Sequence, residues 1–85
     1  MSTRVNYSVR FEVNLGTVPD GVRQEIRRTM EQIAEAVDTV PPASPFWSSL
    51  KNSVLQIDVK DWRVVYVVDA AKKEIRVTEL ERIRR

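Results

Sequence analysis

The side chains of this chain that could do chemistry are its arginines, lysines, carboxylates, tyrosines and hydroxyls. The 85 residues include neither cysteine nor histidine. This excludes disulfides, thiol nucleophiles and thiolate metal sites, and it removes both the commonest general base and the commonest metal ligand. With only two glycines, no glycine-rich phosphate loop can be written either. We therefore expect no metal and no cofactor.

Positive charge collects toward the carboxy end of the chain. Residues 20–39 hold three arginines and five acids, a net charge of −2, whereas residues 40–85 hold nine lysines or arginines and six acids, a net charge of +3. The last four residues include Arg82, Arg84 and Arg85. Such a basic end can contact phosphates, or it can be a solvated tail.

Length and composition indicate one small globular domain over residues 1–85. The hydrophobic fraction is 42%, and the charged residues, 31% of the chain, are of both signs. This composition favours a folded core over disorder. No apolar run approaches the roughly 20 residues of a membrane span, and residues 1–6 lack a signal-peptide pattern. We expect a cytoplasmic protein with no membrane partner.

Hydrophobic periodicity in the first half predicts a strand and then a long helix. Residues 5–13 alternate apolar and polar side chains, which predicts one strand. The helix is expected to begin with Thr17 as its N-cap and Asp20 as the acidic partner, and to stop before Pro41. Its apolar stripe consists of Val22, Ile26, Met30, Ile33 and Val37.

The second half predicts a meander of three strands. Residues 41–53 are irregular, with one short apolar helical segment around residues 46–50. Strands are expected over residues 55–59, 62–68 and 74–80. The fold class is therefore α+β with two layers, in the order β-α-(α)-β-β-β. An antiparallel sheet packs on one long N-terminal helix plus the short helical segment.

The turn at Lys60-Asp61 determines which face of the sheet each hairpin side chain occupies. With these two residues in the turn, Asp58 pairs with Arg63. Arg63 then projects from the same open face as Gln56 and Asp58, while the alternate residues face the helix. A guanidinium there can bind a phosphate bidentately, or it can pair with Asp58 across the strands.

This hairpin, from Leu55 to Asp69, resembles the central hairpin of RelE/ParE superfamily toxins. In those toxins an alternating strand leads through a tight turn into an aromatic-Arg-aliphatic-aliphatic-Tyr segment, as in Trp62-Arg63-Val64-Val65-Tyr66 here. The surrounding layout is similar, with an opening strand, a helix after Val18-Pro19, a Leu50-Lys51 element and an Arg-rich end. The resemblance covers most of the chain and implies a RelE/ParE-like fold.

For the RelE branch, the resemblance implies a toxin that cleaves messenger RNA on the ribosome. Such an endoribonuclease uses the RNA 2′-hydroxyl as nucleophile and needs no metal. For the ParE branch, it implies a toxin that targets DNA gyrase. Both branches imply a cognate antitoxin as partner. We expect the RelE activity, and the alternatives are a gyrase-targeting toxin, a degenerate antitoxin-binding homologue or an unrelated interaction domain.

The resemblance also implies a set of site residues on the open face. The catalytic candidates are Arg63, Asp58, Arg82 and Arg84. The candidate RNA contacts are Lys51, Gln56, Lys60, Arg76 and Arg85. Arg63 and one carboxy-terminal arginine would stabilise the charge that develops on the phosphate. Asp58 is a possible general base.

Two departures from the RelE pattern favour the alternatives. RelE-type nucleases typically carry lysines where this chain has Gln56 and Asp58, and an amide and a carboxylate cannot replace them as phosphate ligands. Those nucleases also carry a tyrosine after the final arginines. The tyrosines of this chain are Tyr7 and Tyr66, both at expected core positions.

Overall fold

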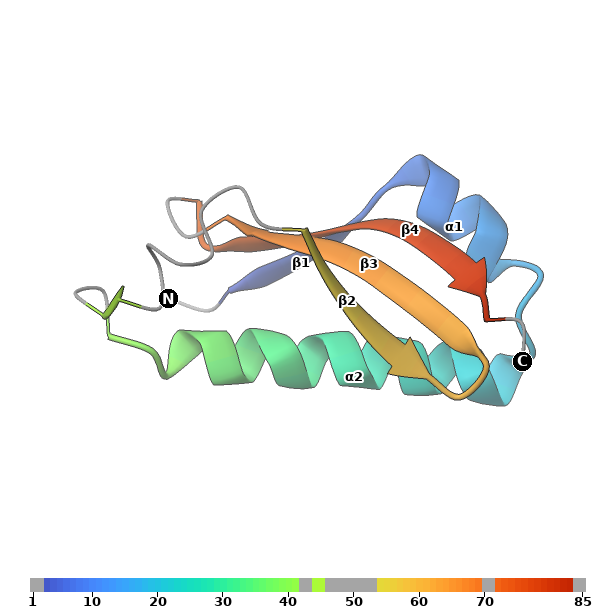
Figure 1. The fold of residues 1–85 in the computed structure, drawn as a ribbon, viewed down its shortest axis with the longest axis horizontal. Helices are drawn as coiled ribbons and strands as arrows, with labels where there is room; N and C mark the ends of the chain where they lie inside the picture. Colours follow the sequence, from blue (N-terminus) through green and yellow to red (C-terminus); the bar gives the residue numbers. More distant parts are fainter. Residues whose placement is uncertain (1–2, 42–43, 46–53, 70–71, 84–85) are drawn as a thin grey trace.

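The computed structural model describes residues 3–41, 44–45, 54–69 and 72–83. Its elements are β1 (Arg4–Tyr7), α1 (Val9–Leu15), α2 (Asp20–Asp38), β2 (Val54–Val59), β3 (Trp62–Asp69) and β4 (Glu74–Arg82). The strands form one sheet in the order β1-β4-β3-β2, and α2 runs along one of its faces (Figure 1). The predicted two-layer α+β fold is confirmed. The predicted helical segment around residues 46–50 lies outside the described residues.

The sheet is mixed rather than wholly antiparallel. The pairs β2–β3 and β3–β4 are antiparallel, as the meander predicts. β1, in contrast, pairs with β4 in parallel, with Arg4 opposite Glu74 and Tyr7 opposite Val77. A parallel pair needs a long connection, and here both helices and the β2–β3 hairpin lie between the two strands in the chain.

The prediction of one strand over residues 5–13 is wrong beyond Tyr7. The Ser8 side chain accepts a hydrogen bond from the Phe11 N–H at 3.1 Å and caps α1 at that point. On a helix, Phe11 and Leu15 lie on the same side, and both are buried. Val9 and Val13 are 82% and 68% exposed. The helix buries Phe11 and Leu15 together and leaves Val9 and Val13 in solvent. The alternation of Val9, Phe11 and Val13, which is typical of a strand, is therefore misleading here.

A matched pair of variants tests this helix. Phe11→Ala should lower the free energy of unfolding by about 3–5 kcal/mol, because it empties a fully buried site. Val13→Ala should lower it by less than about 0.5 kcal/mol, because that side chain is solvated. Urea unfolding followed by circular dichroism measures both. A large loss for Val13→Ala would contradict the helix, since Phe11 and Val13 share a face only on a strand.

The long helix α2 presents the predicted stripe to the sheet but begins differently. Ile26, Met30 and Val37 are buried, and Val22 and Ile33 pack against the same core. The N-cap is Pro19, with no side-chain cap hydrogen bond. The Thr17 hydroxyl instead donates to the Asn14 carbonyl at 2.7 Å, so the predicted Thr17 cap is wrong. Thr17 belongs to the turn that ends α1. The sequence does not predict this turn, because residues 9–13 are predicted as strand.

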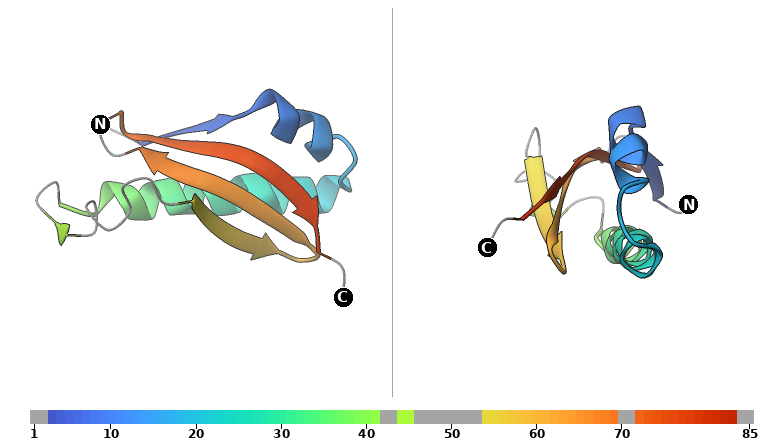
Figure 2. Two further views of the ribbon diagram at one scale, coloured as in Figure 1. Left: turned by 45° about the horizontal axis from the view of Figure 1, so that its top comes forward. Right: turned by 90° about the vertical axis from the view of Figure 1, so that its right-hand side faces the viewer.

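Contacts around Tyr7 and Ser8 join β1 and α1 to the rest of the domain. Tyr7 stacks on Phe11 with ring centroids 5.2 Å apart, and the Arg27 guanidinium of α2 lies 4.9 Å from the Tyr7 ring centroid. Burial raises the pKa of Tyr7. The Ser8 hydroxyl donates to the Thr78 carbonyl at 2.8 Å. α1 therefore continues along β4 beyond the end of β1 (Figure 2).

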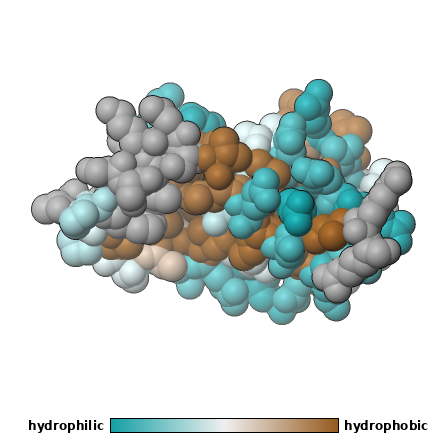
Figure 3. Space-filling model, viewed as in Figure 1, coloured by the Kyte–Doolittle hydropathy of each residue, from teal (hydrophilic) through white to brown (hydrophobic). Residues whose placement is uncertain are grey.

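The core lies between α2 and the sheet. Its fully buried side chains include Ile26 and Met30 of α2, Val64 of β3, and Ile75 and Val77 of β4. An apolar band follows this seam above the polar outer surface of α2 (Figure 3). No helix in the described ranges is long and apolar enough to cross a membrane.

Two hydrogen bonds join the residue before β1 to the end of α2. The Thr3 N–H donates to Asp38 Oδ1 at 2.8 Å, and the Thr3 hydroxyl donates to the same oxygen. The hydrogen bond from the Thr3 hydroxyl is the main reason why the pKa of Asp38 lies below its ordinary value. The folded state thus favours the carboxylate form of Asp38.

Thr3→Val removes the hydroxyl and should return the pKa of Asp38 toward its ordinary value. Because the folded-state pKa is depressed, the stabilisation is present above the unfolded-state pKa of about 3.9 and is lost as the pH falls through the folded-state pKa. The melting temperature of Thr3→Val should therefore fall below that of the unmodified protein most at neutral pH and least in acid. Thr39→Val, which loses a hydroxyl bonded to the Ala36 carbonyl, should show no such pH dependence.

Candidate functional site

The β2–β3 turn lies where the sequence predicts and sets the register of the hairpin. Val59 pairs with Trp62 and Asp58 pairs with Arg63. Lys60 has a φ of 53°, the left-handed conformation that two-residue hairpin turns use. A side chain at such a φ costs roughly 1–2 kcal/mol. The turn directs Trp62 toward α2 and Arg63 away from it.

Asp58, Arg63 and Glu81 form a row on the open face of the sheet, which we call the open-face row. Arg63 lies opposite Asp58 of β2 and opposite Glu81 of β4. Arg63 Nε donates to Asp58 Oδ1 at 3.2 Å. The Arg63 and Asp58 side chains are 39% and 49% exposed. A ligand on this face can therefore reach both the cation and the carboxylate.

A β-bulge in β4 brings Glu81 into this row. The pairing shifts so that Val65 lies opposite Glu79 and Tyr66 opposite Val77, and the Thr78 hydroxyl donates to the Val65 carbonyl at 3.3 Å. Strict alternation from Val77 would direct Glu81 toward the core. The extra residue reverses that parity. The alternating pattern of residues 74–80 gives no sign of the bulge. The sequence therefore does not predict that Glu81 lies on the open face.

The same bulge moves Arg82 to the face opposite Arg63. Arg82 pairs with Trp62, whose side chain packs against the core, and it lines a pocket beside Pro19 and Val22. Arg82 therefore does not share the open face with Arg63, and the predicted pairing of Arg63 with one carboxy-terminal arginine is left to Arg84 and Arg85. Lys60 lines this pocket as well rather than the open face.

Two of the remaining candidate residues lie on the open face, and three lie outside the residues that the structure describes. Gln56 and Arg76 are exposed on the open face, on β2 and β4. Lys51, Arg84 and Arg85 lie outside the described residues. Tyr66 is buried, as expected, and burial raises its pKa. Tyr66 therefore stays neutral within the core and does not reach the open-face row.

The open face of β2, β3 and β4 is acidic. It carries two arginines and five acids, a net charge of −3, in the strand positions Asp58, Arg63, Asp69, Glu74, Arg76, Glu79 and Glu81. Both arginines are already paired, since Arg76 contacts Asp69 at 3.3 Å and Glu74 at 3.9 Å. Glu79 is paired with Arg10 of α1 at 3.3 Å. The strongly cationic face expected for an RNA site is not formed by these strands.

The open-face row has the components of general acid–base chemistry on a phosphodiester. Neighbouring strands are about 4.8 Å apart, so a phosphate over Arg63 would lie between the carboxylates of Asp58 and Glu81. A guanidinium can bind the phosphate, and a carboxylate can accept a proton from an attacking hydroxyl. Within the described residues, no group of three or more carboxylates is placed to hold a metal ion.

Solved structures of RelE toxins align with this chain. The intact E. coli RelBE toxin–antitoxin complex aligns with a TM-score of 0.71 and 15% identity, over 99% of this chain and 100% of that chain. The isolated E. coli RelE toxin aligns with a TM-score of 0.72 and 14% identity, over 99% and 87%. The archaeal RelE–RelB complex from Pyrococcus horikoshii OT3 gives 0.64 and 16%, over 96% of each chain.

These similarities place the chain in the RelE fold class along nearly its whole length. The resemblance seen in the hairpin residues is thereby confirmed at the level of the fold. No protein-family model and no curated protein sequence matches the chain.

A double-mutant cycle measures how strongly the open-face row is held in place. The coupling energy between Asp58→Ala and Arg63→Ala should be about 0.2–1 kcal/mol, because both side chains are well solvated. Each variant should therefore stay folded, as judged by urea unfolding. A coupling of several kcal/mol would mean that the pair is structural and that Arg63 is not available to a ligand.

Proposed function

We propose that this chain is the toxin of a toxin–antitoxin pair. The observation that carries the proposal is the alignment with RelE over nearly all of both chains. Two of the aligned structures are complexes of RelE with its antitoxin RelB. A cognate antitoxin is accordingly the expected protein partner of this chain.

We further propose that the toxin cleaves messenger RNA on the ribosome through the open-face row. The RNA 2′-oxygen would attack the adjacent phosphorus, and the bond from phosphorus to the 5′-oxygen would break. Asp58 would accept the proton of the 2′-hydroxyl, and the departing 5′-oxygen would take a proton from water. Arg63 would bind the phosphate as its negative charge develops.

Because the Arg63–Asp58 ion pair is exposed, replacing Asp58 with a phosphate as the partner of Arg63 costs little free energy. An exposed pair contributes about 0.2–1 kcal/mol. A charge-assisted, bidentate contact between arginine and phosphate is stronger than an ordinary hydrogen bond. A phosphate can therefore displace the Asp58 carboxylate from Arg63, which also leaves that carboxylate free to accept a proton.

The acidity of the open face favours a second candidate, a toxin or homologue that does not cut RNA. A net charge of −3 on the open face of β2, β3 and β4 repels an RNA backbone. Gln56 and Asp58 stand where RelE-type nucleases carry lysines. A gyrase-targeting toxin of the ParE kind, or a homologue that only binds its antitoxin, would have no need of a cationic sheet face.

Induced expression in bacterial cells distinguishes these functions when growth and messenger-RNA 5′ ends are followed together. The proposed function predicts growth arrest with new 5′ ends inside translated codons. Arg63→Ala should reduce cleavage by a factor of about 10²–10³, because it removes the group that stabilises the developing charge. Arg28→Ala is the matched control, since Arg28 also forms an exposed ion pair, with Glu25 on α2. Cleavage by that variant should be unchanged.

The alternative outcomes are separable in the same cultures. Arrest with intact messages and damaged DNA would identify gyrase as the target. Continued growth with a folded product would leave only the antitoxin-binding homologue. Equal cleavage by the Arg63→Ala variant and the unmodified protein would remove the open-face row from the mechanism.

A further inference from the structure

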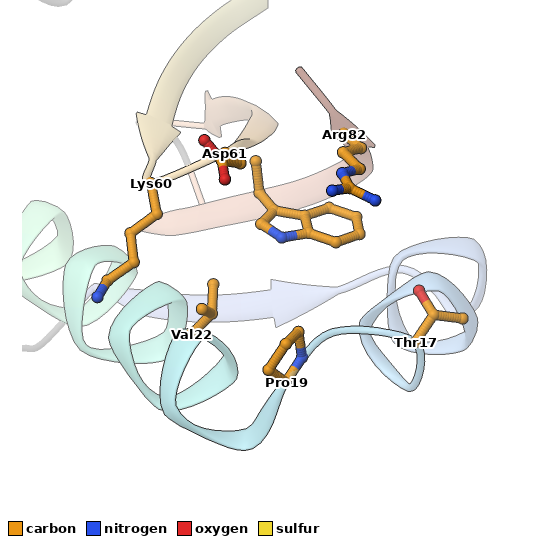
Figure 4. A pocket seen from close by; sticks show the side chains of 7 residues that line it. Thr17, Pro19, Val22, Lys60, Asp61 and Arg82 are labelled. Carbon is orange, nitrogen blue, oxygen red and sulfur yellow. The ribbon is translucent and has the colours of Figure 1, made fainter. Parts of the chain in front are cut away.

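A separate pocket lies on the side of the sheet that faces α2. It opens where the start of α2, the β2–β3 turn and the end of β4 meet, and its volume is about 320 Å³ (Figure 4). That volume is at the lower end of the range for small-molecule sites. We call it the turn pocket. The register of β3 and β4 separates it from the open-face row, because Trp62 and Arg82 line it whereas Arg63 and Glu81 point the other way.

The turn pocket holds two cations that have no acidic partner among the described residues. Lys60 and Arg82 form no ion pair with any residue that the structure describes, in contrast to Arg63 and Arg76. Asp61 is the one acid among the described residues of the lining, so these residues carry a net charge of +1. In Figure 4, Lys60 and Arg82 lie on opposite sides of the pocket, with Pro19 and Val22 below them. An anion would be attracted here rather than to the acidic open face.

Backbone contacts join the two chain segments that carry these cations. The Ile83 N–H donates to the Asp61 carbonyl at 2.7 Å. This hydrogen bond joins the end of β4 to the β2–β3 turn. The turn itself holds Lys60 at a φ of 53°, where a side chain is strained. The turn that carries Lys60 and the strand end that carries Arg82 are thus joined through the backbone.

The rest of the lining suits a flat ring with polar substituents. The half-buried indole of Trp62 offers an aromatic surface on which a nucleobase can stack. Pro19 and Val22 supply an apolar floor. The Thr17 hydroxyl and the Asp61 carboxylate are acceptors for the hydroxyls of a sugar.

We propose that the turn pocket binds one nucleotide unit, with its base on Trp62 and its phosphate beside Arg82, while Lys60 adds positive charge on the other side of the pocket. A free nucleotide and a nucleotide within single-stranded RNA share this chemistry. The proposal is independent of the proposed toxin activity, since it uses neither the open-face row nor any cleavage step.

Nitrogen-15 NMR of the full chain tests the proposal. The two tryptophans give two indole N–H signals, and Trp62→Phe identifies the one from Trp62. Adenosine 5′-monophosphate should shift that signal saturably, and it should do so at lower concentration than adenosine or inorganic phosphate alone. Arg82→Gln should raise the Kd about tenfold, because it removes a charged hydrogen-bond donor to the phosphate. Lys60→Gln should raise it about threefold, because it removes a cation that attracts the anion from a distance. Thermal unfolding verifies that these exposed substitutions leave the fold intact.

Arg76→Gln is the matched control, because Arg76 lies on the same strand as Arg82 but on the open face. Its Kd for adenosine 5′-monophosphate should be unchanged. A short 2′-O-methyl RNA, which cannot be cleaved through its 2′-oxygen, distinguishes the two sources. Tighter binding of this RNA with the same dependence on Lys60 and Arg82 would identify an RNA-borne nucleotide, and binding of the mononucleotide alone would identify a free one.

Three outcomes would overturn the proposal. The first is the absence of a saturable Trp62 shift with either probe. The second is inorganic phosphate acting as well as the nucleotide, which would leave no role for the base. The third is an equal loss of affinity in Arg76→Gln and Arg82→Gln, which would reduce the effect to overall charge.

Discussion

The register of β3 against its two neighbours determines where the charged side chains of this sheet lie. The Lys60-Asp61 turn fixes β3 against β2, and the bulge at Thr78 fixes it against β4. Together they place Arg63 between two carboxylates on one face and Arg82 beside Trp62 on the other. A slip of one residue on either side would exchange the two faces. The separation of the open-face row from the turn pocket follows from this register alone.

The energy that holds the register comes mainly from the opposite side of the sheet. Burying one large apolar side chain contributes about 1.5–3 kcal/mol, whereas an exposed ion pair contributes about 0–1 kcal/mol. Most side chains between α2 and the sheet are buried, whereas Asp58, Arg63 and Glu81 of the open face are exposed or partly exposed. The open face can therefore change its charges without loss of the fold. This explains how the chain keeps the RelE fold at 15% identity while its open face is acidic.

The sequence predicts the parts of the fold that depend on strong periodicity. The stripe of α2 and the β2–β3 hairpin follow from apolar spacing and a two-residue turn, and the hairpin register places Arg63 correctly. The predicted first strand extends too far because Val9, Phe11 and Val13 continue the two-residue alternation of a strand. Only burial shows that Phe11 shares a helix face with Leu15. The bulge at Thr78 depends on how β4 meets β3 and leaves no local pattern. Because of this bulge, the sequence does not predict the position of Glu81 and predicts the wrong face for Arg82.

The central claim, that the open-face row cleaves RNA, is tested most directly with purified components. The protein is added to ribosomes translating one defined message, and the chemistry of the new RNA ends is determined. If the 2′-oxygen is the nucleophile, as proposed, the cuts should fall inside translated codons and leave a 2′,3′-cyclic phosphate and a 5′-hydroxyl. A message that stays intact with folded protein in excess over ribosomes would contradict the claim.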